Sequence, residues 1–350
     1  MTLIIDRRAL IGAAAMAALI PVRALAQSSS SSLSLVHPDL RAIVPQIEAF
    51  SKNVPPLTRA GLAKARTGSN PLQRPPRTDV PYKKRVIAVG RGQPDVAIYI
   101  INSKPGTSRP AILHTHGGGY VLGSAESSVR GLQDLCAELD CIAVSVEYRL
   151  APETTYKGSV EDNYAGLKWL HANAASLGAD PKRIAVMGES AGGGHAALLA
   201  ITARDRGEVP LCFQCLIYPM LDDRTGTSRK MPAHVGTLIW TPERNRFGWE
   251  SFLGSSAGGT RVPAGGVPAR VMDLKGLPPT WIGVGTLDLF ADEDVDYAQR
   301  LNAVGVATEL IVVPGAFHGF DGIAAGVPVG RWFNTAKHNA LRRAFGIAVV

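Results

Sequence analysis

Cysteine is scarce in this chain, with four residues among 350, at Cys136, Cys141, Cys212 and Cys215. So few thiols exclude a fold that depends on a disulfide framework. The spacing of Cys212 and Cys215 raises the question of a zinc or redox site, but both lie in the strand-like segment 211–218, where positions three apart point to opposite faces. The two thiols therefore cannot readily meet one metal ion or each other, and we interpret them as buried structural residues.

The chain also lacks a cluster of positive charge. Its formal net charge is +8, but Lys and Arg are scattered among acidic and apolar residues. A nucleic-acid surface would require these cations to gather on one face, so the sequence argues against a nucleic-acid partner. With 46% hydrophobic and only 19% charged residues, the chain can bury a large core as one sizeable domain with a smaller appendage.

Long apolar runs of membrane-spanning length are missing near the N-terminus. The uncharged run 9–20 has 12 residues, whereas a spanning helix needs about 20. A pair of arginines precedes this run, and a small-x-small cleavage signature ending at Ala26 follows it, which is the pattern of an export signal. We therefore expect residues 1–26 to be a signal peptide cleaved after Ala26, leaving an exported, periplasmic or secreted protein without a stable membrane anchor. The arginine pair resembles a twin-arginine signal, although Asp6 stands where a hydroxyl residue is usual.

The remaining chain divides into an N-terminal segment, 27–84, and a larger domain, 85–350. Residues 27–84 contain a serine-rich spacer, apolar residues at helical spacing and a proline-rich stretch, which predicts a linker followed by N-terminal cap helices. From 85 to 350, apolar runs that we expect to be strands occur at 86–89, 96–101, 111–114, 141–146, 184–187, 211–218, 280–284 and 309–313. Helical patterns separate most of the later runs, at 129–139, 160–175, 191–204 and 292–303.

This alternation predicts an α/β fold with a mostly parallel, eight-stranded sheet covered by helices on both faces. The alternation stops at about 221–273. An insertion of this length in an α/β domain usually forms a lid or substrate-binding cap.

The clearest chemical motif is the run Gly188 to Gly192, which places Ser190 between an apolar strand pattern and an alanine-rich helix pattern. Such a strand, tight turn and helix hold a serine hydroxyl clear of the sheet, so Ser190 is the candidate nucleophile. A second G-x-S-x-G string contains Ser256, but no strand precedes it and no helix follows it. We interpret that second string as a helix end running into a loop.

A serine nucleophile needs a base and an acid that orients the base. His318 follows the last predicted strand, on a loop at the strand end where active groups of α/β sheets lie. Asp288 ends the strand and loop 281–287, whereas Asp292, Glu293 and Asp294 fit the first turn of the next helix, where acids stabilise the helix N-terminus. Asp288 is therefore the candidate orienting acid, and the order Ser190, Asp288, His318 is that of α/β-hydrolases.

The reaction also needs donors for the negative charge that develops on the substrate carbonyl. The run His116 to Gly119 follows a predicted strand, and its consecutive glycines allow backbone N–H groups to approach a ligand closely. We assign Gly117 and Gly118 as donors, together with the N–H of Ala191. The neighbouring His114 could form a metal pair with His116, but no further ligand pattern accompanies them, so no metal is expected.

Five ordered motifs extend this pattern: His116 to Gly119, Tyr148 to Glu153, Gly188 to Gly193, Asp288-x-x-x-Asp292-Glu293 and Phe317 to Phe320. Together they resemble the bacterial hormone-sensitive-lipase-like family (family IV) of carboxylesterases in the α/β-hydrolase superfamily. The resemblance implies a triad of Ser190, Asp288 and His318, oxyanion donors Gly117, Gly118 and Ala191, and a cap built from the N-terminal helices and the insertion.

The chain departs from the family pattern at two positions beside the site. Glu189 stands where many members carry Asp, and Leu289 stands where many carry Pro. Neither difference removes a catalytic group. The segment Tyr148 to Glu153 is expected to be scaffolding near the site.

We therefore expect a serine hydrolase that cleaves small-molecule carboxylic esters with short to medium acyl chains through an acyl-enzyme on Ser190. An amidase or deacetylase with the same triad is the main alternative, because the same chemistry serves both leaving groups. A ligand-binding fold without activity is the other. No nucleotide, flavin or metal fingerprint is present, so no cofactor is expected, and the sequence does not indicate an oligomeric state.

Overall fold

The computed structural model describes residues 33–67, 74–90 and 92–349. The predicted signal peptide at 1–26 lies outside these residues. The fold below is that of the compact unit formed by residues 36–350.

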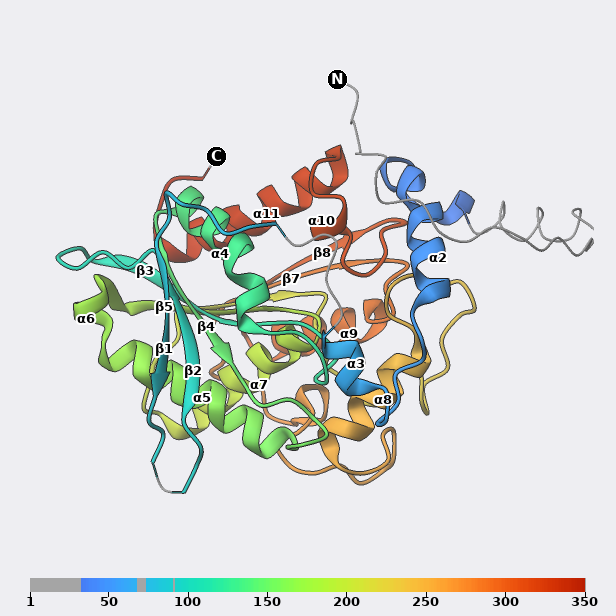
Figure 1. Cartoon of the computed structure of the whole chain (residues 1–350), viewed down its shortest axis with the longest axis horizontal. Helices are drawn as coiled ribbons and strands as arrows, with labels where there is room; N and C mark the ends of the chain where they lie inside the picture. The colour runs from blue at the N-terminus through green and yellow to red at the C-terminus, as the bar shows by residue number, and fades with distance from the viewer. Residues whose placement is uncertain (1–32, 68–73, 91, 350) are drawn as a thin grey trace, which may run out of the picture. The chain divides into compact units, whose positions relative to one another are not determined.

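A single eight-stranded sheet organises the described part of the chain, with the order β1-β2-β4-β3-β5-β6-β7-β8 (Figure 1). The pairs β1–β2 and β2–β4 are antiparallel, and every later pair is parallel. This confirms the predicted α/β-hydrolase architecture. The strands are β1 (Tyr82–Ile87), β2 (Val96–Ile101), β3 (Arg109–Thr115), β4 (Ile142–Glu147), β5 (Ala179–Glu189), β6 (Phe213–Ile217), β7 (Thr280–Gly285) and β8 (Thr308–Val313).

Helices cover both faces of the sheet, as its buried central strands require. In Figure 1, α4 and α11 lie on one side and α5 and α7 on the other. The helical elements are η2 (Pro38–Ile43), α2 (Val44–Asn53), α3 (Leu62–Thr67), α4 (Ala125–Leu139), α5 (Tyr156–Ala172), α6 (Ala174–Leu177), α7 (Ala191–Arg206), α8 (Pro242–Leu253), η3 (Pro268–Arg270), α9 (Ala291–Ala303), α10 (Phe320–Ile323) and α11 (Pro328–Phe345). Within the described ranges, no helix is both long and apolar enough to cross a bilayer.

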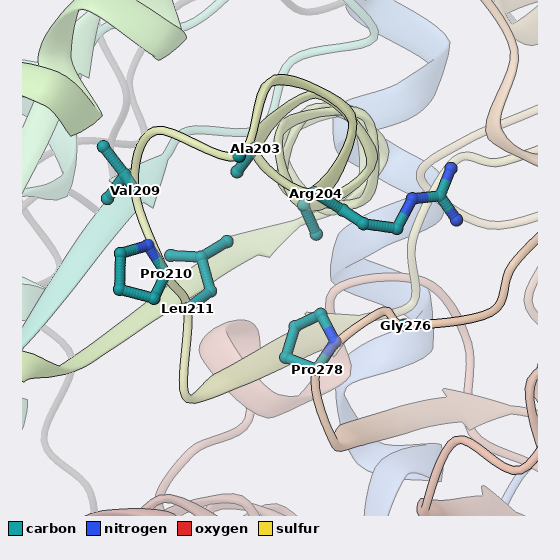
Figure 2. A pocket seen from close by; sticks show the side chains of 9 residues that line it. Ala203, Arg204, Val209, Pro210, Leu211, Gly276 and Pro278 are labelled. Carbon is teal, nitrogen blue, oxygen red and sulfur yellow. The ribbon is translucent and has the colours of Figure 1, made fainter.

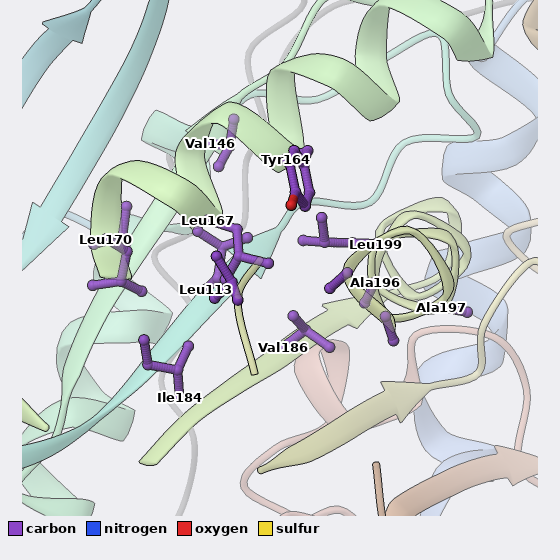
Figure 3. Packing of buried hydrophobic residues seen from close by; sticks show 14 of the residues in the cluster. Leu113, Val146, Tyr164, Leu167, Leu170, Ile184, Val186, Ala196, Ala197 and Leu199 are labelled. Atoms are coloured by element: carbon purple, nitrogen blue, oxygen red, sulfur yellow. The ribbon is translucent and has the colours of Figure 1, made fainter. Parts of the chain in front are cut away.

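The main core fills the space between the central strands and helices α5 and α7 (Figure 3). Strand residues such as Leu113 and Val186 meet Leu167 of α5 and Leu199 of α7, and all four side chains are essentially inaccessible to water. Each such burial contributes about 1.5–3 kcal/mol. This packing fixes α7, and therefore the residue at its N-terminus, against the sheet.

Element boundaries differ from the predicted ones mainly at the N-terminal ends. Helix α4 begins at Ala125 instead of residue 129, because the Ser124 side chain caps it by accepting a hydrogen bond from the Ser127 N–H. Strand β1 begins at Tyr82, in a largely exposed stretch without the apolar pattern on which the prediction depended. Both differences come from local features that hydrophobic periodicity does not report.

A second, smaller core lies above the carboxyl ends of the strands. There Trp249 and Phe252 of α8 pack with Tyr120, Leu198 and Phe290, which come from the main domain. Helix α8 belongs to the predicted insertion, which the structure thus places over the end of the sheet that carries the motifs.

Helix α3 of the N-terminal segment is hydrogen-bonded to loops at the same end of the sheet. The guanidinium of Arg66, on α3, donates to the carbonyls of Val121 and Ala151 at 2.9 and 2.8 Å and pairs with Glu153. These contacts connect the N-terminal helices to the loops that surround the candidate site.

Candidate active site

Ser190 occupies a strained turn between β5 and α7. Its backbone angles are φ 59° and ψ −125°, a conformation that only a well-held residue other than glycine keeps. The flanking glycines are required by close packing, because a Cβ on Gly188 would lie 2.3 Å from the carbonyl oxygen of Gly192. The turn thus has the geometry expected for a nucleophile elbow.

The structure brings the three predicted triad residues into one hydrogen-bonded chain. Ser190 Oγ lies 2.9 Å from His318 Nε2, and His318 Nδ1 lies 2.8 Å from Asp288 Oδ2. Asp288 is fully buried, and its second oxygen accepts a hydrogen bond from the Phe290 N–H at 3.0 Å. A carboxylate at Nδ1 fixes the proton there and leaves Nε2 free to accept the serine proton.

The candidate oxyanion donors lie beside this serine. A Cβ on Gly117 would be only 3.5 Å from the Cβ of Ser190, so the glycine backbone passes directly next to the nucleophile. Among the described residues, neither Gly117 nor Gly118 donates its N–H to a backbone carbonyl. Ala191 is the first residue of α7, where N–H groups have no partner within the helix. These three N–H groups are available for a ligand oxygen.

A family model described as the alpha/beta hydrolase fold matches residues 112–322. The chain belongs to this family. It is 37% identical over 241 residues to carboxylesterase NlhH of Mycobacterium tuberculosis, covering 67% of this chain and 74% of that protein. It is 32% identical to an ethyl acetate hydrolase of Pseudomonas putida, covering 62% and 67%.

Solved structures agree with these relatives. A bacterial heroin esterase superposes with a TM-score of 0.77 at 35% identity, covering 90% of this chain and 99% of that one. Esterase LipW of Mycobacterium marinum gives 0.71 at 33% identity, covering 89% and 97%. The resemblance to hormone-sensitive-lipase-like carboxylesterases is thus confirmed.

The loop 116–119, which carries two of the candidate oxyanion donors and is called the oxyanion loop below, is supported by the segment that starts at Tyr148. The Tyr148 hydroxyl donates to the carbonyl of His116 at 2.6 Å, and the two rings stack with centroids 4.2 Å apart. Arg149 is held by the buried carboxylate of Asp162 at 2.8 Å. The segment Tyr148 to Glu153 is therefore scaffolding, as the sequence predicts.

The predicted insertion packs on the same loop. A Cβ on Gly119 would lie 2.0 Å from the Trp240 ring, and a Cβ on Gly248 would lie 2.6 Å from the Gly119 carbonyl oxygen. Tyr120 donates its hydroxyl proton to the Met220 carbonyl at 2.8 Å, at the start of the insertion. The oxyanion loop is thus held between the sheet domain and the predicted insertion.

His114 and Glu189 form a polar pair under the elbow. His114 Nε2 lies 3.0 Å from Glu189 Oε2, and His114 Nδ1 lies 2.9 Å from Ser145 Oγ. Burial raises the pKa of Glu189, but His114 outweighs that effect, and the net pKa is below its usual value. Both nitrogens of His114 are occupied, and the described residues contain no group of His, Cys, Asp and Glu that could hold a metal ion.

One of the three acids that the sequence analysis assigned only to a helix N-terminus has a further role. Asp292, Glu293 and Asp294 do lie in the first turn of α9. However, Glu293 is buried and accepts hydrogen bonds from the Leu221 and Asp222 N–H groups, at 2.6 and 3.1 Å. Its carboxyl therefore anchors the first residues of the cap insertion, a contact between positions about 70 apart that no local pattern indicates.

The cysteines are all free thiols in the described chain. Cys212 immediately precedes β6, whereas Cys215 lies within this strand and is fully buried. Burial raises the pKa of the two thiols to about 11 and about 12. The interpretation as structural residues is consistent with both observations.

A cavity of about 490 Å³ lies at the opposite end of the strands (Figure 2). Leu211 and Pro278 line it just before β6 and β7 begin, whereas Ser190 follows the carboxyl end of β5. The one ionisable side chain in its lining, Arg204, already donates to two backbone carbonyls and pairs with Asp205. This cavity has no group suited to acyl transfer.

Proposed function

We propose that this protein hydrolyses carboxylic esters by acyl transfer to Ser190, with His318 as general base and Asp288 as the orienting acid. The observation that carries the proposal is the continuous hydrogen-bond chain from Ser190 Oγ through the imidazole to Asp288, at 2.9 and 2.8 Å. The carboxylesterases and ester hydrolases among its relatives support it. The reaction needs no cofactor.

In the first half of the reaction, Ser190 Oγ attacks the ester carbonyl while its proton passes to His318 Nε2. The carbonyl oxygen becomes negatively charged and accepts hydrogen bonds from the N–H groups of Gly117, Gly118 and Ala191. When the tetrahedral intermediate collapses, the imidazolium donates its proton to the departing alcohol. In the second half, His318 deprotonates a water that releases the acid from the serine.

The proposed substrates are small molecules with short to medium acyl chains. In support, Trp240 of the insertion is almost fully buried against the oxyanion loop, so its ring takes up space beside the oxyanion donors. The ethyl acetate hydrolase among the relatives is consistent with small esters. Nothing in the charge pattern favours a nucleic-acid partner.

The second G-x-S-x-G string offers a matched control for the nucleophile. Ser190→Ala should lower kcat on short-chain nitrophenyl esters by about 10⁴-fold or more. Ser256→Ala, in the exposed loop after α8, should leave kcat within about twofold. Equal rates in wild type and Ser190→Ala would refute the assignment, and faster hydrolysis of matched amides than of esters would identify an amidase instead.

We also propose that the protein is exported, on the strength of the arginine pair, the 12-residue apolar run and the signature ending at Ala26. Expression in a Gram-negative host should give a periplasmic protein whose N-terminal sequence begins at Gln27. An uncleaved N-terminus in the cytoplasmic fraction would contradict this proposal.

A further inference from the structure

Behind the catalytic imidazole lies a buried polar network that the proposed mechanism does not use. The Tyr218 hydroxyl donates to Asp321 Oδ1 at 2.6 Å, and Lys337 Nζ lies 3.1 Å from Asp321 Oδ2. Lys337 also donates to Asn334 Oδ1 at 2.7 Å. Tyr218 and Asp321 are each 6% exposed, and the Lys337 side chain is 13% exposed. Burying an ion pair costs free energy unless its groups are well hydrogen-bonded, and here each group has at least one partner. The network is therefore part of the folded interior and differs from an exposed surface ion pair.

Tyr218 connects this network to both members of the reacting pair. Its ring meets the His318 ring at a centroid distance of 4.8 Å and an interplanar angle of 63°. Its chain neighbours hold the nucleophile, because the Ser190 N–H donates to the Ile217 carbonyl and the Met220 N–H donates to the Ser190 carbonyl, both at 2.9 Å. A movement of Tyr218 would therefore shift the serine and the imidazole relative to each other.

The backbone at Tyr218 needs an anchor of this kind. Its φ of +34° lies in the left-handed region that residues other than glycine rarely adopt. The Tyr218 N–H donates to the Gly283 carbonyl of β7 at 2.7 Å, which fixes the main chain, and the hydroxyl bond to Asp321 fixes the far end of the ring. Asp321 follows His318 by three residues. Its carboxylate therefore connects the segment that carries His318 to Tyr218, whose ring contacts the His318 imidazole.

We propose that Tyr218 is a positioning residue for the Ser190–His318 pair, with the buried Asp321–Lys337 ion pair as its anchor. This inference rests on the proposed function. Together with Phe290, whose ring meets the imidazole at a centroid distance of 5.3 Å and an interplanar angle of 85°, Tyr218 restricts the tilt of His318. The ring contacts the base and not the substrate, so its loss affects the chemical step and leaves substrate binding in place.

The test compares Tyr218→Phe with Tyr164→Phe. Tyr164 is also buried and donates its hydroxyl proton to an acid, Glu208, at 3.1 Å, but it lies on α5 away from the triad. Tyr218→Phe should lower kcat about ten- to a hundredfold with KM within about twofold, since small misplacements of reacting groups have effects of this size. Tyr164→Phe should leave both within about twofold.

Titration with a fluorophosphonate distinguishes positioning from partial unfolding. Tyr218→Phe should bind one phosphonate per chain, as the wild type does, but more slowly. A wild-type kcat in Tyr218→Phe, or a fall in kcat that matches a fall in titratable sites, would overturn the positioning role. If Ser190→Ala kept full activity, the proposed function would fall as well, so the two failures are distinguishable.

A second pair of variants decides the question if Tyr218→Phe does not fold. Asp321→Asn with Lys337→Met removes both buried charges but keeps an oxygen that accepts the Tyr218 proton. Asp321→Leu with Lys337→Met removes the charges and the acceptor. We expect kcat of the first double variant to exceed that of the second about tenfold or more, and equal values would overturn the proposal.

Discussion

His195 should make this protein sensitive to mild acid. It lies on α7 with 1% of its surface exposed, and neither ring nitrogen has a hydrogen-bond partner among the described residues. Its ring is enclosed by those of Tyr120, Tyr148 and Phe252, at centroid distances of 5.1, 4.4 and 5.2 Å. This burial lowers the pKa of His195 from 6.5 to about 3, because a protonated imidazole would lose its hydration without gaining an acceptor.

The sign of the effect follows from where the proton binds. In the unfolded chain His195 takes up a proton below pH 6.5, whereas in the folded chain it does so only near pH 3. The contribution to stability is therefore intact above pH 6.5 and is lost progressively as the pH falls towards 3. At pH 5 the unfolded state gains about 2 kcal/mol from this one residue, since each pH unit below its pKa is worth about 1.4 kcal/mol.

His195→Leu removes the titrating group and keeps an apolar side chain of similar size. Urea unfolding at pH 7.5 and pH 5.0 should show that the wild type loses more stability between the two values than the variant, by about 2 kcal/mol. His234→Leu, at an exposed position in the cap, is the control and should leave the wild-type loss in place. An equal loss in wild type and His195→Leu would refute the reasoning.

Two glycine substitutions with opposite expected signs follow from the packing. Gly119→Ala should lower the free energy of unfolding by about 1–3 kcal/mol and kcat/KM by about tenfold or more. The alanine would have to keep the backbone angle φ +60°, and its Cβ would lie 2.0 Å from the Trp240 ring, beside the oxyanion donors. Gly131→Ala should raise stability by about 0.5–1 kcal/mol without changing kcat/KM, because Gly131 is exposed within α4 with no atom within 4 Å of the new Cβ. Thermal unfolding and ester kinetics check both, and wild-type kcat/KM in Gly119→Ala would contradict the cap contact.

The triad could be predicted because each member has a local sequence context. Ser190 follows a strand and begins a helix, Asp288 ends a strand before a helix, and His318 lies on the loop after the last strand. Parallel strands bring their carboxyl ends to one edge of the sheet, so order along the chain predicts proximity in space. The oxyanion loop follows from the same rule, because Gly117 comes two residues after β3 ends at Thr115.

The supporting contacts could not be predicted in this way. Tyr218 and Asp321 are 103 residues apart, and neither has a local pattern that names the other. The contact of Trp240 with Gly119 depends on how the cap docks, which is decided by side-chain packing in the second core. Such contacts depend on shape complementarity between distant segments, whereas periodicity reports only which face of an element is apolar.

Two buried acids near the triad, Asp288 and Asp294, differ in their hydrogen-bond partners. Asp288 accepts hydrogen bonds from His318 and from the Phe290 N–H, so each of its oxygens has a partner. Asp294 is as deeply buried, but neither of its oxygens has a hydrogen-bond partner in the described chain. Burial, and to a smaller extent the nearby carboxyl groups of Glu293 and Asp288, raise the pKa of Asp294 well above its usual value. A second anion there would repel Asp288, so the missing donors around Asp294 favour its protonated form. The imidazolium that forms on His318 then meets a single buried carboxylate at Nδ1, while the rings of Tyr218 and Phe290 restrict its tilt.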